Sequence, residues 1–511
     1  MSYTVCIVLA IVLYLAGMLY VGYVCSKRNS NVDDFYLGGR KLGPFVTAMS
    51  AEASDMSSWL LMGLPGVAYL TGIANATWTA IGLAIGTYLN WLIVARRIRV
   101  YSHTIHSITI PDFFSNRYGD KKYILSSAAA IMIIIFFIPY TASGFAACGK
   151  LFHSLFGVDY VVAMIISAAI IVGYCALGGF LAASTTDLIQ SIVMTIALFI
   201  VVTFGIVSAG GWDAVIENAA SLSGYLSLSH VYDPATGTAS SYSALTAFSL
   251  LAWGLGYFGM PHVLLRFMAT EDENKIKTSR RIATVWVVIS MTVAVLIGIV
   301  GLAMTNAGVM PALKDSETII INIAHVISQH GVIAAFVAGI ILSGILASTM
   351  STADSQLLAA ASSVSQNIIQ DLFGIKLSTK KSMIAARTTV VIIAIIAVFL
   401  ARDPNSNVFS IVSFAWAGFG ATFGPIVLFA LFWKRSNLWG ALAGMIAGGI
   451  MVFVWKFGIA TLGGVFAIYE LLPAFLVACV VNIIVSLITP APDQTVLDTF
   501  DAVTKKLSKK A

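Results

Sequence analysis

The run AEASDMSSW at residues 51–59 places two acids and three serines inside an otherwise apolar, helix-length segment. An acid near the bilayer midplane costs about 2.5–3.5 kcal/mol on insertion scales, so such residues usually face a cavity or a partner. A plainer interpretation makes the run the cytoplasmic end of a spanning helix, because Ser and Asp also cap helices. We favour an interruption midway along the second spanning helix.

The surrounding composition is that of a membrane protein. Of the 511 residues, 59% are hydrophobic and 10% are charged, whereas soluble domains carry roughly 25% charged residues. Apolar runs of ~20 residues predict about 13 transmembrane helices. Lys and Arg, Arg266 among them, gather in alternate connections that we place in the cytoplasm, which predicts an N-terminus outside and a C-terminus in the cytoplasm. We therefore expect a multi-pass protein of the inner (cytoplasmic) membrane, surrounded by lipid and with no nucleic-acid partner.

A second interruption is predicted in the run AWGLGYFGMPH at residues 252–262, in the seventh span. Its three glycines and Pro261 free backbone groups that must line a cavity or find new partners. A glycine face that packs helices closely is the alternative. No strand precedes the G-x-G-x-x-G letters, so we reject a dinucleotide site. Because the two interruptions lie five spans apart, they predict two five-helix units of opposite orientation.

Hydroxyl groups form a stripe near the end of the ninth span. Ser348, Ser351, Thr352 and Ser355 are spaced i, i+3, i+4, i+7 and share one helix face. Oxygen ligands suit a small hard cation, although small polar residues also pack helices closely. Two acids are ambiguous: Asp187 is either a helix N-cap or part of an ion exit path, and Asp354 beside the stripe has the same two interpretations.

Several clusters occur in an order typical of one family. They are DDFYLGGR at 33–40, SDMS at 54–57, WGLGYFG at 253–259 with Pro261-His262, MST at 350–352 and WAGFG at 416–420. Together they cover nearly the whole chain and resemble the sodium:solute symporter family, in particular its proline-transporting members.

The resemblance implies an all-α integral membrane fold with a LeuT-type core of 5+5 inverted repeats. It implies an extra N-terminal helix and loop at 1–43 and a ten-helix core at 44–433, with repeats at about 44–208 and 243–433. Two additional helices would follow at 434–490, and a loose cytoplasmic tail at 491–511.

The resemblance also implies the sites. Sodium would bind the carbonyls of Ala53, Met56 and Ser348 and the hydroxyls of Ser351 and Thr352, with Asp55 assisting. A second sodium site or exit path would involve Asp187, Asp354 and Ser355. The substrate would lie against Ser57, Ser58, Trp59, Tyr140, Trp253, Tyr257, Met260 and Pro261. Ser58 stands where proline-specific members usually have Gly, and Met260 where they often have Gln, so these two positions bear on substrate identity.

The expected function is import of L-proline, or a closely related small amino acid, by sodium symport through alternating access. Sodium is the coupling ion, and neither a catalytic residue nor an obligate protein partner is expected. A sodium- or proton-coupled symporter of another small solute is the alternative on the same fold. A channel or sensor fits less well, and an enzyme least, because no nucleophile–base pair stands out.

Overall fold

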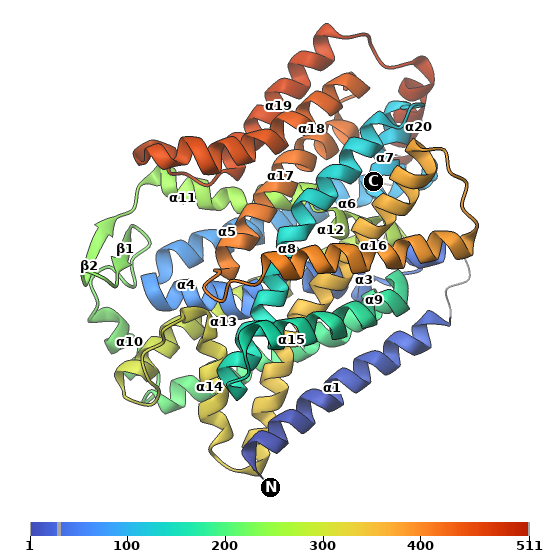
Figure 1. Ribbon diagram of the computed structural model, residues 1–511. Helices are drawn as coiled ribbons and strands as arrows, with labels where there is room; N and C mark the ends of the chain where they lie inside the picture. The colour runs from blue at the N-terminus through green and yellow to red at the C-terminus, as the bar shows by residue number, and fades with distance from the viewer. Residues whose placement is uncertain (1, 28–31, 509–511) are drawn as a thin grey trace.

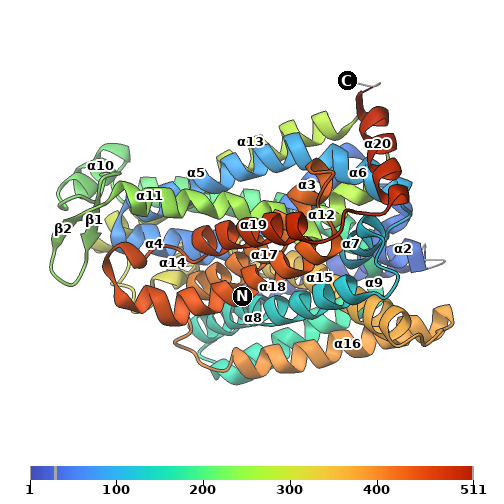
Figure 2. The ribbon, with the colours of Figure 1, turned by 90° about the horizontal axis from the view of Figure 1, so that it is seen from above.

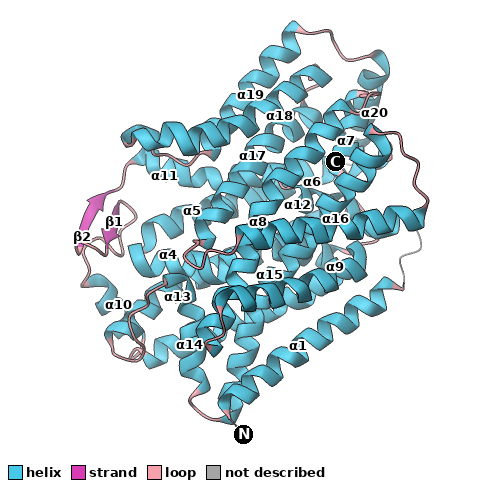
Figure 3. Cartoon of the chain, viewed as in Figure 1, coloured by secondary structure: helices cyan, strands magenta, loops and turns pink. Residues whose placement is uncertain are grey.

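The computed structural model describes residues 2–27 and 32–508 as a helical bundle with one short hairpin (Figures 1 and 3). Residues 1, 28–31 and 509–511, which belong to the predicted N-terminal segment and tail, lie outside this description. The hairpin pairs β1 (His230–Asp233) with β2 (Thr238–Ser241) in antiparallel register. It lies with α10 (Trp212–Ala220) at one end of the bundle (Figure 2).

Ten helices of the described chain are long and apolar enough to cross a membrane, and a bent pair gives an eleventh. The long elements are α1 (Tyr3–Ser26), α5–η3–α6 (Ile73–Leu89, Asn90–Val94, Ala95–Thr104), α8 (Ile124–Phe156), α9 (Tyr160–Ser208), α13 (Ile276–Asn306), α15–η6 (Val332–Ser362, Ser363–Leu372), α16 (Thr379–Leu400), α17 (Val408–Phe432), α18 (Leu438–Val454) and α19 (Leu471–Ile488). Gly179, with φ 66°, kinks α9 into two spans. Counting those two spans and the two interrupted helices agrees with the prediction of about 13.

The first interrupted helix breaks where the sequence predicted. Helix α3 (Pro44–Ser58) leaves helical geometry at Ser57, whose φ is 50° and ψ is −171°. A π-turn, η2 (Trp59–Gly63), and helix α4 (Leu64–Thr71) continue the span. The span runs from Pro44 to Thr71 and the run around Asp55 lies midway along it, so the interpretation of this run as a cytoplasmic helix end is wrong.

The second interrupted helix also breaks as predicted. Helix α11 (Ala244–Leu251) tightens into the 3-10 segment η4 (Ala252–Gly259), and extended backbone at Met260 precedes helix α12 (Pro261–Ala269). The two arms are bent by 48°. Proline cannot continue the hydrogen-bond ladder of a preceding helix, which explains the position of the break.

The glycines of η4 also pack closely, so both interpretations of that run hold. A Cβ on Gly254 would lie 2.2 Å from the Gly82 carbonyl oxygen of α5, and one on Gly256 would lie 1.9 Å from Nε1 of Trp416 on α17. Glycine is therefore required where η4 passes between these two helices.

The first spanning helix, α1, and the last two, α18 and α19, pack against other long helices of the bundle. Helix α1 packs on α9 and α15, whereas α18 and α19 pack on each other and on α17 (Figure 1). The prediction of a loose tail is wrong for the described part, since residues Gln494–Ser508 form helix α20. Its buried Val496, Phe500, Val503 and Leu507 recur with helical spacing, and the Arg117 guanidinium lies over the Phe500 ring.

Short connecting elements complete the described chain. They are α2 (Val32–Leu37), η1 (Gly38–Arg40), α7 (Ile110–Tyr118), η5 (Ser316–Thr318), α14 (Ile319–Ser328), η7 (Trp455–Ile459), η8 (Ala460–Leu462) and η9 (Gly464–Phe466). Helices α2, α7 and α20 lie at the end of the bundle opposite the hairpin (Figure 2). Two arginines at this end donate hydrogen bonds to carbonyl oxygens of α17. Arg97 donates to the Leu431 carbonyl oxygen at 2.7 Å, and Arg117 donates to the Ala430 carbonyl oxygen at 2.8 Å.

Candidate functional site

The interrupted α3 faces the hydroxyl stripe of α15. The Ser351 hydroxyl lies 2.8 Å from the Ala53 carbonyl oxygen and 3.2 Å from the Ser348 carbonyl oxygen. Thr352, one residue further on, is buried, and its hydroxyl has no protein partner. Four of the predicted sodium ligands therefore gather between α3 and α15. The fifth, the Met56 carbonyl, receives the Trp59 N–H at the break and keeps one lone pair.

Asp55 connects this cluster to the second interrupted helix. The Tyr257 hydroxyl of η4 lies 2.5 Å from Oδ2 of Asp55, while Oδ1 has no protein partner. The Tyr140 hydroxyl of α8 donates to the Asp55 carbonyl oxygen at 2.9 Å. Thus two tyrosines from two other elements hold one residue, through its carboxylate and through its backbone.

These tyrosines also line a small aromatic cavity beside the break. The cavity has a volume of about 10 Å³, which is room for about one water molecule. We call it the aromatic cavity, and its lining residues are Asp55, Met56, Trp59, Leu83, Tyr140, Trp253, Tyr257, Val412 and Trp416. A cavity of this size indicates a closed conformation.

The predicted substrate residues divide into three groups. Trp59, Tyr140, Trp253 and Tyr257 line the aromatic cavity. Ser57 lines a neighbouring cavity together with Tyr140 and Thr352. Ser58, Met260 and Pro261 are buried but line neither cavity.

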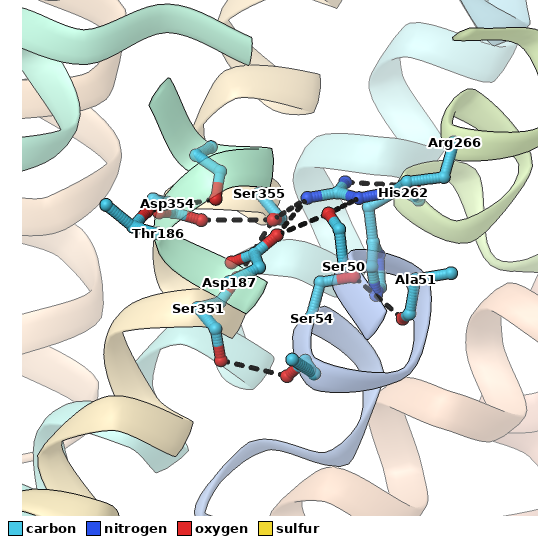
Figure 4. Close-up of polar contacts among 12 residues, drawn as sticks. Ser50, Ala51, Ser54, Thr186, Asp187, His262, Arg266, Ser351, Asp354 and Ser355 are labelled. Carbon is cyan, nitrogen blue, oxygen red and sulfur yellow. Dashed lines mark hydrogen bonds and ion pairs between the residues drawn. The ribbon is translucent and has the colours of Figure 1, made fainter. Parts of the chain in front are cut away.

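The predicted second cation site is a buried network in which Asp187 and Arg266 form an ion pair (Figure 4). Asp187 Oδ2 lies 2.9 Å from Arg266 Nη2 and 2.6 Å from the Ser50 hydroxyl. Arg266 also reaches the Ser355 hydroxyl at 2.5 Å, and Ser355 lies 3.0 Å from Oδ1 of Asp354. One oxygen of each carboxylate has no protein partner.

This network corrects two interpretations. Asp187 lies within α9, eight residues beyond its kink, and the side chain that caps α9 belongs to Asp159, so Asp187 is not an N-cap. We expected Arg266 in a cytoplasmic loop, yet it is 1% exposed on α12. The available signal for its burial was its position in the middle of an apolar helix, α12, because a charge inside an apolar segment needs a partner.

A second buried ion pair lies at the end of the bundle that carries the hairpin. Glu317 of η5 is 2% exposed and accepts from Lys150 Nζ at 2.7 Å. It also accepts the backbone N–H groups of Val408 at 3.0 Å and Phe409 at 2.9 Å. A carboxylate at a helix N-terminus satisfies free amides and favours the helix dipole. Glu317 therefore ties the start of α17 to α8 and η5.

We predict that Glu317→Gln slows transport about tenfold, equal to about 1.4 kcal/mol, by weakening the attachment of α17. The control is Asp315→Asn, because Asp315 contacts the same lysine at 2.8 Å but its side chain is 39% exposed and screened by solvent. Initial uptake rates in vesicles test this. Equal rates for the two variants would contradict the role of Glu317.

A third acidic contact lies at the opposite end. Burial, and next the nearby Asp371 carboxylate, raise the pKa of Asp112 on α7 to about 6 against opposing hydrogen bonds. The Asn367 amide donates to both acids, and Thr109 shares a capping box with Asp112. Between pH 4 and 6 the folded chain therefore keeps a proton that the unfolded chain has released.

Stability should consequently fall as the pH rises from about 4 to 6 and level off above that range. Asp112→Asn should remove this component, about 3 kcal/mol for a pKa raised from 3.8 to about 6, while preserving the cap. Melting temperatures of the purified protein across this window test it, with Glu217→Gln on exposed α10 as control. An unchanged slope in Asp112→Asn would refute the assignment.

Sequence reasoning missed several residues beside these sites. Glu52 accepts from the Trp91 indole at 2.8 Å, and Trp416 donates to the Trp253 carbonyl oxygen at 2.8 Å. Tyr469 stacks on Trp253 with centroids 5.1 Å apart. Glu317 and Tyr469 come from connections between spans, and no helical pattern could have indicated their contacts.

Comparisons with known proteins agree with this geometry. The sodium:solute symporter family model matches residues 35–448. The chain is 40% identical over 507 residues to the osmoregulated proline transporter OpuE of Bacillus subtilis, covering 99% of each chain. It is 41% identical over 502 residues to a sodium/proline symporter of Haemophilus influenzae, covering 96% of each.

A solved structure supports the fold. A Na⁺-coupled sialic acid symporter in a substrate-bound outward-open state superposes with a TM-score of 0.78 at 19% identity, covering 96% of this chain and 98% of that one. The predicted LeuT-type 5+5 fold is confirmed at this level. By its family match, its full-length relatives and its two interrupted helices, this chain belongs to the sodium:solute symporter family.

Proposed function

We propose that this protein imports L-proline into the cell by symport with Na⁺. The observation that carries the proposal is the 2.8 Å approach of the Ser351 hydroxyl to the Ala53 carbonyl, across the break in α3. The names of the relatives, a proline transporter and a sodium/proline symporter, support both the ion and the passenger.

Sodium binds in what we call the sodium cage: the carbonyls of Ala53, Met56 and Ser348 and the hydroxyls of Ser351 and Thr352. Oxygen ligands suit a hard monovalent cation, and the unpartnered Thr352 hydroxyl is available to one. Asp55 supplies a nearby negative charge. No group of three His, Cys, Asp or Glu side chains in the described chain could hold a metal ion; the cage is instead built mainly of carbonyls and hydroxyls.

Proline binds in the aromatic cavity after it widens in the outward-open state. Its ring packs on Trp253 and Tyr257, and its carboxylate faces amides freed at a helix break, where the helix dipole favours negative charge. The other predicted contacts are Tyr140, Trp59, Ser57, Ser58, Met260 and Pro261. Ser58 and Met260 are buried and line neither cavity in this structure, so their departures from the usual residues do not by themselves argue against proline.

Asp55 couples the two ligands. Sodium in the cage draws the Asp55 carboxylate into a fixed position, and Tyr257, bonded to that carboxylate, then presents its ring to proline. The repeats, at about 44–208 and 243–433, rock about the occupied site. The membrane potential, negative inside, adds about 2.3 kcal/mol per charge per 100 mV and drives sodium inward. We place the N-terminus outside and the C-terminus in the cytoplasm.

Asp187, Asp354 and Ser355 form the exit path, or a second sodium site, below the cage. Ser355 joins both parts, because its hydroxyl lies 2.8 Å from the Ser351 carbonyl oxygen and also contacts Arg266. A cation that leaves the cage therefore meets the unpartnered carboxylate oxygens of two acids.

Uptake of labelled L-proline into proteoliposomes tests the function. An imposed sodium gradient should drive accumulation, and a proton gradient alone should not. Trp253→Ala should raise the KM for proline by a larger factor than it raises the half-saturating sodium concentration. Sodium-driven uptake of another small solute, uninhibited by proline, would replace proline with the alternative cargo. Uptake without any sodium requirement would overturn the proposal.

A further inference from the structure

One aromatic side chain at the aromatic cavity comes from outside the ten-helix core. Tyr469 lies in the connection between α18 and α19, which passes close to α11 (Figure 1). It is 8% exposed. Its ring stacks on Trp253 with a centroid distance of 5.1 Å and an interplanar angle of 21°. Trp59 also lies next to Trp253, with ring centroids 5.4 Å apart. Trp253 thus contacts Trp59 of η2 and Tyr469 of the connection between α18 and α19.

The polar groups of Tyr469 bind two elements of the core. Its hydroxyl donates to the Ser413 carbonyl oxygen of α17 at 2.7 Å, and its backbone N–H donates to the Ser249 hydroxyl of α11 at 2.6 Å. A buried hydroxyl with a partner is the usual condition for tyrosine inside a protein. One residue therefore bridges α11, which leads into the interrupted η4, and α17, whose Val412 and Trp416 line the cavity.

The connection holds Tyr469 in place from both sides. The Trp455 indole donates to the Ile468 carbonyl oxygen at 3.2 Å, directly before Tyr469. Directly after it, Glu470 pairs with Lys456 at 3.0 Å and its side chain is 8% exposed. These contacts orient the Tyr469 ring before any substrate arrives. Less side-chain entropy is therefore lost when the cavity closes over the substrate.

We infer that the connection between α18 and α19, residues 455–470, is an external lid, and that Tyr469 is its positioning residue, which holds Trp253 in its closed position over the bound substrate. This inference rests on the proposed function for the identity of the substrate, although the closing of the cavity is a property of the chain alone. Loss of the ring favours the open state, and apparent substrate affinity falls with the population of the closed state.

Two kinetic effects follow for Tyr469→Ala. The KM for proline rises about tenfold, because the stacking on Trp253 and the hydroxyl bond to Ser413 are lost. The half-saturating sodium concentration does not rise, since the lid lies away from the sodium cage. General damage to the structure would weaken both ligands. Tyr469→Phe keeps the ring and loses one hydrogen bond, so its effect is about threefold.

Accessibility gives the direct test. Val412, which lines the aromatic cavity, is replaced by Cys in each background, and a membrane-impermeant maleimide is added outside intact cells. Labelling should accelerate about tenfold in Tyr469→Ala and about threefold in Tyr469→Phe. The matched control is Phe466→Ala: Phe466 lies in the same connection, is 44% exposed and packs on Trp455. The parent chain without the new Cys gives the background.

The outcomes separate the lid role of Tyr469 from the proposed substrate site. Equal labelling of Tyr469→Ala and Phe466→Ala overturns the lid role. If Tyr469→Ala is not recovered as folded protein, Tyr469→Phe decides. The inference is overturned if the cysteine introduced at position 412 is labelled as slowly in Tyr469→Phe as in the chain that keeps Tyr469. If Trp253→Ala leaves the KM for proline unchanged, the proposed substrate site fails, whereas the labelling comparison still decides the lid.

Discussion

Replacing Asp55 with alanine should raise the sodium concentration that half-saturates uptake about a hundredfold. A carboxylate about 6 Å from a monovalent cation contributes about 2.8 kcal/mol at an effective dielectric constant of 20, which is about two decades in affinity. Asp55 is nearly buried, so solvent screens little of this attraction. The measurement is the sodium dependence of initial proline uptake.

Two companion variants separate charge from shape. Asp55→Asn keeps the side-chain size and a partner for the Tyr257 hydroxyl, and should lose nearly as much sodium affinity as the alanine variant. Tyr257→Phe keeps the charge and removes the 2.5 Å contact, and should affect proline more than sodium. A wild-type sodium curve in Asp55→Ala would remove Asp55 from the ion site.

Replacing Arg266 with glutamine should lower the stability of the protein by about 3–5 kcal/mol, because the Asp187 carboxylate is left buried without its cation. Both side chains are almost completely enclosed, and Arg266 also binds Ser50 at 3.0 Å. We expect a large drop in melting temperature and a fall in uptake beyond that of any surface arginine. Arg281→Gln, at an exposed position on α13, is the control.

The double variant Arg266→Gln with Asp187→Asn identifies the cause. Removing both charges should recover most of the lost melting temperature, since an uncharged buried pair avoids the desolvation penalty. Uptake should stay low, because the exit path has then lost a carboxylate. A double variant that melts as low as Arg266→Gln would show that the arginine acts through something other than Asp187.

Residues that act within their own helix were predictable. The period of 3.6 placed Ser351 and Thr352 on one face, and the polar run around Asp55 together with Pro261 indicated the two breaks. These signals are local, because they depend on helix geometry and on the cost of polar groups in lipid. The same local rule, applied to Val496, Phe500 and Val503, would have revealed helix α20.

Residues that act between elements were not predictable in the same way. Arg266 was assigned to a loop because a charge in an apolar stretch normally marks a helix end, and only the position of Asp187 on α9 makes its burial possible. Glu317 and Tyr469 sit in short connections with no periodic pattern. Their partners, Val408 and Trp253, are distant in the sequence and become neighbours only when the bundle packs.

The sequence by itself determined that the chain crosses the membrane many times, that two helices break, and that oxygen-bearing side chains lie beside one of the breaks. Hydrophobic length and the cost of unsatisfied backbone in lipid are enough for those conclusions. The tertiary structure alone decided which break meets which stripe, which acid has a cation, and which ring stacks on Trp253 beside the cavity. Those facts depend on distances between chain segments far apart in sequence, which packing sets and local patterns do not encode.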